Sequence, residues 1–155
     1  ALRAGAPLYV DSNMIRAGLS MARLRQVHAS YAPDKIHCHV ADDDVAREAL
    51  QAGLPRSLFA IRKARAILHG GIVALGNAPV ALLELNRMIR EEDVRPALVI
   101  GLPVGFVHVE ESKAELLALP VPSIIIVGRR GGSNLAVSVV HALCTVAGRK
   151  AGKGA

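Results

Sequence analysis

Short apolar runs alternate along the chain with longer segments of helical periodicity. Five runs rich in Val, Ile and Leu predict β-strands, at 8–10, 36–40, 71–75, 97–100 and 124–127. The last three are apolar on both faces, which is typical of strands buried between two layers of helices. The run 124–127, three isoleucines followed by a valine, is the clearest of the five.

The segments between these runs carry apolar residues at helical spacing. Helices are predicted at 43–51, 56–68, 79–90, 110–117 and 134–146. Gly53 is a normal stop for the first of them. Strands that alternate with helices pair in parallel through right-handed crossovers. The predicted fold class is therefore α/β, with three layers and a mostly parallel sheet of about five strands flanked by helices.

No internal repeat or linker interrupts this pattern. Residues 1–147 are predicted to form a single α/β domain, and 148–155 a flexible basic tail. Aromatic residues make up only 3% of the chain, so the core must be built from Val, Ile, Leu and Ala.

The formal net charge of +6 admits three kinds of partner: nucleic acid, an acidic membrane surface or a polyanionic small molecule. The basic residues form no single stripe, and few rings are present to stack bases. No apolar run approaches the length of a transmembrane helix, and no signal peptide is recognised. We therefore expect an anionic small ligand, no nucleic acid and no membrane. Cys38 and Cys144 are expected to be reduced, buried thiols of a cytoplasmic protein.

Ligands of open parallel sheets bind at the carboxyl ends of the strands, and three predicted strand ends carry unusual loops. The first is Gly76-Asn77-Ala78-Pro79, where Asn77 can cap the next helix and Pro79 suits its first turn. Free N–H groups in that turn would favour an anion. A plain capped turn explains the same residues.

The second loop, 102–107, is apolar and holds Phe106, one of only two phenylalanines. It either lines a pocket or interface, or Phe106 covers the sheet edge.

The third loop is Gly128-Arg129-Arg130-Gly131-Gly132-Ser133. Its glycines allow an anion-binding nest, and guanidinium groups match carboxylates. Ser133 or Asn134 can cap the following helix. An exposed basic turn is the alternative, but unpaired arginines at the end of a buried strand are costly. The three loops together predict a groove for a ligand with several carboxylates and an apolar body.

Other constellations are weaker. Strand alternation separates His37 and His39 from Cys38, and no further ligand spacing is visible, so no metal site is predicted. His141 is interpreted as a core histidine. His108 directly follows the second loop and is the one histidine considered as a candidate for a functional role. Asp42-Asp43-Asp44 is interpreted as a helix N-cap with dipole partners.

Several motifs together resemble those of the precorrin-8X (cobalt-precorrin-8) methylmutase family. The segment 73–82 is similar to its GNAPTAL element, 96–113 to its PALVIG-PVGFV-AAESK element, and 127–133 to its RGRRGGS element. The start, 5–15, resembles the family's GAPI-CDA-MV stretch, and Arg56-Ser57 stands where the family has TRSA. The resemblance runs from about Ala1 to Val146.

This resemblance implies homodimers with a flavodoxin-like α/β fold. Its implied activity is an isomerisation that moves a methyl group between adjacent ring carbons of precorrin-8X or cobalt-precorrin-8 and yields hydrogenobyrinate or cobyrinate. The resemblance implies a polycarboxylate tetrapyrrole (corrin) as the partner, and it implies that no cofactor is needed.

Substrate-binding residues carried over from the family motifs come from all of these segments: Asp11, Met14, Arg56, Gly76, Asn77, Ala78, Pro79, Gly105, Phe106, Val107, Ser112, Lys113, Arg129, Arg130, Gly131, Gly132 and Ser133. The family's catalytic histidine matches a position upstream of Ala1, so no catalytic residue is assigned in this chain. His108, Val109 and Val80 depart from the family pattern. Two alternatives stay open: a non-catalytic corrinoid-binding module that lacks the histidine, and a structural α/β subunit without a ligand.

Overall fold

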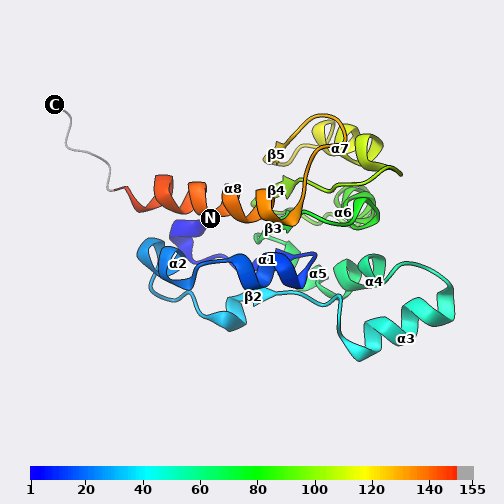
Figure 1. Cartoon of the computed structure of the whole chain (residues 1–155), viewed down its shortest axis with the longest axis horizontal. Coiled ribbons are helices and arrows are strands. Elements are labelled where there is room, and N and C mark those ends of the chain that lie inside the picture. The colour runs from blue at the N-terminus through cyan, green and yellow to red at the C-terminus, as the bar shows by residue number, and fades with distance from the viewer. Residues whose placement is uncertain (150–155) are drawn as a thin grey trace.

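A five-stranded, all-parallel sheet forms the centre of the protein in a computed structural model, which describes residues 1–149 (Figure 1). The strands are β1 (Leu8–Val10), β2 (Ile36–His37), β3 (Ile72–Leu75), β4 (Leu98–Gly101) and β5 (Ser123–Ile125). Their order is β2-β1-β3-β4-β5, the doubly wound order of flavodoxin-like folds. The predicted fold class is confirmed.

Helices connect the strands and cover both faces of the sheet. They are α1 (Asn13–Gly18), α2 (Met21–Val27), α3 (Asp43–Ala52), α4 (Arg56–Lys63), α5 (Arg65–Leu68), α6 (Pro79–Glu91), α7 (Val109–Leu117) and α8 (Ser133–Gly148). Two 3-10 turns, η1 (Leu2–Ala4) and η2 (Pro33–Lys35), precede β1 and β2.

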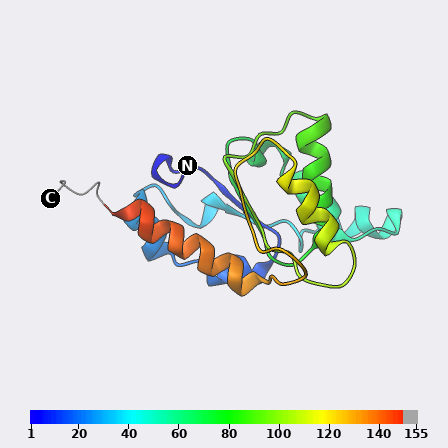
Figure 2. The same ribbon diagram turned by 90° about the horizontal axis from the view of Figure 1, so that it is seen from above.

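The sheet divides the core into two parts, as Figure 2 shows from above. Side chains of α1, α2 and α8 pack on one face, where Ile15, Leu24 and Val140 are buried. Side chains of α4 to α7 pack on the other, with Ile61 and Leu85 fully buried. Helix α3 projects away from the sheet in both views. The three predicted layers are present.

Two strands differ from the prediction. β2 ends at His37 rather than at residue 40, because its pairing with β1 stops at Tyr9↔His37, although β1 continues to Val10 in its pairing with β3. The predicted run 124–127 pairs only as Ser123–Ile125 and lies at the edge of the sheet. All three of its residues are half-buried and Val127 is 80% exposed, so this strand is not covered on both faces as β3 is.

The predicted helix at 56–68 is broken at Ala64. The chain tightens there to a 3-10-type bond from Ile67 N to Ala64 O, and α5 restarts at Arg65. Ile61 and Leu68, which lie on either side of the break, are both buried in the same core cluster.

Helices α1 and α2 were not predicted. Ser12 caps the first by accepting a hydrogen bond from Ile15 N, and Ser20 caps the second by accepting one from Arg23 N. Both are ordinary N-cap serines, so a local signal was present.

Three predicted caps are absent. Neither Asn77 nor Ser133 nor Asn134 caps a helix, because Ala78 and Gly132 occupy the N-cap positions without a side-chain bond. Asp42 occupies the N-cap of α3 but also makes no capping bond.

Asp42 instead accepts hydrogen bonds from His39 and Lys63. Asp43 and Asp44 do lie in the first turn of α3, where acidic residues suit the helix dipole.

Of the predicted tail 148–155, Gly148 is the last residue of α8. Residues 150–155 of the tail lie outside the described part of the chain. Among residues 1–149, no helix is both long and apolar enough to cross a membrane.

Candidate functional site

The carboxyl edge of the sheet is organised around a buried carboxylate. Asp11 follows β1 and is 2% exposed. Its Oδ1 accepts a hydrogen bond from Gly76 N at 3.0 Å, and its Oδ2 accepts from Asn77 N at 2.8 Å and Ala78 N at 2.9 Å. Burial raises the pKa of Asp11, and the three backbone N–H donors partly oppose that rise.

Asp11 therefore corrects the prediction for the first loop. The N–H groups of 76–78 were expected to face a ligand, but the protein's own carboxylate already occupies them. The loop is held in place by Asp11, and Asn77 is its only exposed residue.

The second and third loops contact each other through their backbones. Gly132 N donates to Leu102 O at 2.9 Å. A Cβ atom at Gly131 would lie 2.2 Å from Leu102 O and 2.5 Å from Pro103 O, so only glycine allows this approach.

The first and third loops touch in the same way. A Cβ at Gly76 would lie 2.7 Å from Ser133 Cα. Ser133 Oγ shares a 2.9 Å hydrogen bond with Ser12 Oγ, a contact that links α8 to the segment after β1. All three loops thus form one continuous edge, as predicted from their places after β3, β4 and β5.

Two of the predicted substrate-binding residues point into the protein. Ser112 is fully buried and donates to Val109 O. Lys113 is 2% exposed and donates through Nζ to Gly128 O at 2.8 Å and Arg130 O at 2.6 Å. Burial lowers the pKa of Lys113, and the charge of Glu110 partly opposes the shift.

The two arginines of the third loop are exposed, contrary to the burial that the sequence suggested. Arg129 Nε lies 3.1 Å from Glu110 Oε2, and both side chains are more than half exposed. Glu110 was not predicted as a site residue. Its position in the sequence could have indicated it, because Glu110 lies in the first turn of α7, directly after the loop that follows β4.

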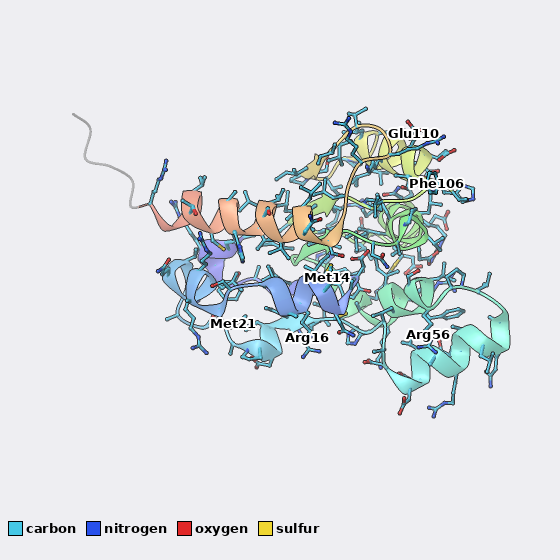
Figure 3. All side chains as sticks on the ribbon, viewed as in Figure 1. Met14, Arg16, Met21, Arg56, Phe106 and Glu110 are labelled. Carbon is cyan, nitrogen blue, oxygen red and sulfur yellow. The ribbon has the colours of Figure 1, made fainter. Side chains whose placement is uncertain are left out.

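Exposed apolar side chains lie on the second loop and on α1. Phe106 is 88% exposed and Val107 67% exposed, so the interpretation that Phe106 covers the sheet edge is wrong. Met14 on α1 is 69% exposed. Figure 3 shows Phe106 and Glu110 together near α7, with Met14 on the helix that follows β1.

Arg56 belongs to a different part of the molecule. It begins α4, beside α3 (Figure 3). Together with Leu50 and Leu54 it lines a surface hollow of about 550 Å³. The remaining predicted residues, Pro79, Gly105, Gly131 and Gly132, belong to the three loops themselves.

Histidines contribute little to this edge. His108 is exposed, with φ 59°, at the N-cap of α7. His141 accepts a hydrogen bond from Ser20 N at 3.0 Å through Nε2, in line with its interpretation as a structural histidine. Within residues 1–149, no three His, Cys, Asp or Glu side chains converge as metal ligands would. Cys38 and Cys144 are free and buried.

In chemical terms, the edge carries exposed guanidinium groups on its third loop and exposed apolar side chains on its second. Such a surface suits an anion with an apolar body, held by charge-assisted hydrogen bonds.

Comparison with known proteins gives a consistent result. The family model described as precorrin-8X methylmutase matches residues 1–146. The cobalt-precorrin-8 methylmutase of Leptospira interrogans is 38% identical over 97% of this chain and 70% of its own length. That of Priestia megaterium is 42% identical over 95% of this chain and 63% of its own length.

Among solved structures, a precorrin-8x methyl mutase from Thermus thermophilus superimposes with a TM-score of 0.83 and 41% identity. The match covers 95% of this chain and 68% of that chain, so this chain spans about two thirds of the length of these relatives. The fold, the motifs and the matches agree, and the chain belongs to the precorrin-8X methylmutase family.

Proposed function

We propose that this chain acts in corrin biosynthesis as an isomerase that moves a methyl group between adjacent ring carbons of precorrin-8X or cobalt-precorrin-8. Residues 1–147 serve as one methylmutase-like domain. The observation that carries the proposal is the joined edge of three loops, of which one carries exposed Arg129 and Arg130 and another carries exposed Phe106 and Val107. A corrin combines peripheral carboxylates with a large apolar ring, and this edge offers partners for both.

The reaction depends more on how the protein positions the substrate than on reactive side chains. Methyl migration leaves the atoms and electrons of the substrate unchanged in number, so no oxidant, reductant or cofactor takes part. Arginines and N–H donors that hold the carboxylates fix the ring, and a fixed ring holds the methyl group over its acceptor carbon. A proton on the ring would assist the shift, and no residue of this chain is assigned as its donor.

The decisive experiment is a titration with hydrogenobyrinate, read by absorbance, for the wild-type chain and for Arg129→Ala with Arg130→Ala. Loss of two charge-assisted contacts is expected to weaken binding by about 30-fold or more. The control is Arg23→Ala with Arg47→Ala, which removes the same charge from exposed helical sites. Equal affinity of both variants would contradict the arginine assignment.

Turnover separates this proposal from its alternative. Wild-type binding accompanied by methyl migration supports the isomerase. Tight binding without migration favours the non-catalytic corrinoid-binding module. Absence of binding by the wild-type chain overturns both.

The family resemblance also supports a cytoplasmic homodimer. Leu50 is 84% exposed and Leu54 is 50% exposed on the projecting α3–α4 hairpin. Apolar surface of this kind is what subunit contacts cover. Sedimentation velocity should give twice the chain mass of 16.3 kDa. A single species with the mass of one chain would contradict the dimer.

A further inference from the structure

Lys113 is the one buried cation beneath the arginine-bearing turn in the described part of the chain. It projects from α7, and its Nζ donates to two carbonyls of the turn, those of Gly128 and Arg130. An ammonium group has three donors and no acceptor, so it can satisfy carbonyl oxygens that face the interior. Both carbonyls therefore point inward, toward α7.

Peptide geometry fixes where the adjoining N–H groups point. No cis peptide bond occurs in residues 1–149, and in a trans peptide the N–H points opposite to the C=O. The N–H groups of Arg129 and Gly131 therefore point away from Lys113. Within residues 1–149 neither of them donates a hydrogen bond. They remain free to donate to a ligand that approaches the turn from the side opposite Lys113.

Other contacts hold the turn without fixing these two peptides. Gly131 lies against the carbonyls of Leu102 and Pro103, and Arg129 pairs with exposed Glu110. Without Lys113, the carbonyls of 128 and 130 would lack their buried donor and would rotate toward water. Their negative ends would then face the incoming anion in place of the N–H groups.

We propose that Lys113 is a positioning residue, which turns the peptides at 128–129 and 130–131 so that the N–H groups of Arg129 and Gly131 receive one carboxylate of the ligand. This inference rests on the proposed function for the identity of the ligand. Its structural half, the orientation of the turn, does not depend on any ligand.

The test uses Lys113→Met, which keeps the apolar stem and removes the donors, with Lys35→Met as a control that removes the same charge near the opposite edge strand. The first readout needs no ligand: the rate at which trypsin cuts the native chain after Arg129 or Arg130. A freed turn should be cut about tenfold faster in Lys113→Met, and at the wild-type rate in Lys35→Met. The second readout is the affinity for hydrogenobyrinate, expected to fall about tenfold in Lys113→Met alone.

The two readouts separate the possible failures. Wild-type cleavage rates in Lys113→Met overturn the positioning role, whatever the affinity. Faster cleavage with unchanged affinity overturns the role in ligand binding, because a merely structural lysine loosens the turn without moving affinity. Faster cleavage in a chain whose wild type binds no corrin supports the orientation of the turn and overturns the proposed function. If Lys113→Met fails to fold, Lys113→Gln, which keeps one donor group on a shorter stem, is judged by the same measurements.

Discussion

Two buried charges of opposite sign share one task at the carboxyl edge of the sheet. Asp11 accepts from three backbone N–H groups, and Lys113 donates to two backbone carbonyls. Each is matched to the polarity of the loop it meets, because a carboxylate only accepts and an ammonium only donates. Neither charge is free for a ligand, so both act by shaping the backbone that a ligand would meet.

Replacing Asp11 by Asn should cost stability. An amide has a single acceptor oxygen, and its NH₂ group would face a backbone N–H of the loop 76–78. At least one buried donor would lose its partner, with an expected loss of about 1–3 kcal/mol in the free energy of unfolding, measured by urea denaturation. The exposed Asp34→Asn serves as control, expected within about 0.5 kcal/mol of wild type. A loss no larger than the control's would show that the loop does not depend on the carboxylate.

For individual residues, the sequence identified the segments that form the site but not whether each side chain points into the protein or toward solvent. The motifs marked Asp11, Ser112 and Lys113, yet their burial follows from partners elsewhere in the chain, such as the loop 76–78 for Asp11. Local pattern carries no information on such distant pairs. Arg129 and Arg130 show the opposite case. They were expected at the end of a buried strand but are exposed, because strand 123–125 lies at the edge of the sheet.

Among the helices, α4 and α6 are joined by a nearly buried carboxylate. Glu84 on α6 is 5% exposed and accepts from Arg62 of α4 at 2.8 Å and from Arg87 of its own helix at 2.6 Å. Burial raises the pKa of Glu84, but the hydrogen bonds from Arg87 and Arg62 outweigh it, and the pKa is lowered overall.

Because the pKa of Glu84 is lowered in the folded protein, the free energy of unfolding depends on pH. The unfolded chain takes up the proton first, so the contribution of Glu84 is present above its unfolded pKa and is lost as the pH falls through its folded pKa. Glu84→Gln should lower the free energy of unfolding at pH 7 by about 1–2 kcal/mol. The gap to wild type should close between about pH 5 and pH 3. Urea denaturation at four pH values measures this, with the exposed Glu48→Gln as control; a gap that stays constant with pH would exclude a role for the charge.

Elements were predicted best where one pattern ran uninterrupted. The helix at 79–90 matches α6 to within one residue, because its apolar face and its Pro79 start are both local signals. The segment 56–68 was predicted as one helix because it contains no Gly or Pro, and no local residue signal marks the break at Ala64. Helices α1 and α2 are short, and periodicity is least informative over so few residues.

For the molecule as a whole, the strand order explains why distant motifs converge. In the order β2-β1-β3-β4-β5, the sheet grows in opposite directions from β1 and β3, and ligands of such folds bind where the direction changes. The loops after β1, β3, β4 and β5 meet along that edge, although they are separated by up to 121 residues, as Ser12 and Ser133 are. The strand order therefore brings four motifs that are separate in the sequence together at one edge of the sheet.

The net charge of +6 adds a long-range term to that surface. A positive protein attracts a polycarboxylate from a distance, and salt screens this attraction as the Debye length falls from about 10 Å at 0.1 M to about 3 Å at 1 M. We therefore expect the affinity for hydrogenobyrinate to fall about tenfold or more across this range of sodium chloride concentration. The same corrin with its carboxylates converted to amides is the control, and its affinity should change little. If salt left the carboxylate form unaffected, its binding would have to rest on the apolar contacts of Phe106 and Val107 rather than on the arginines, because apolar burial is not weakened by screening.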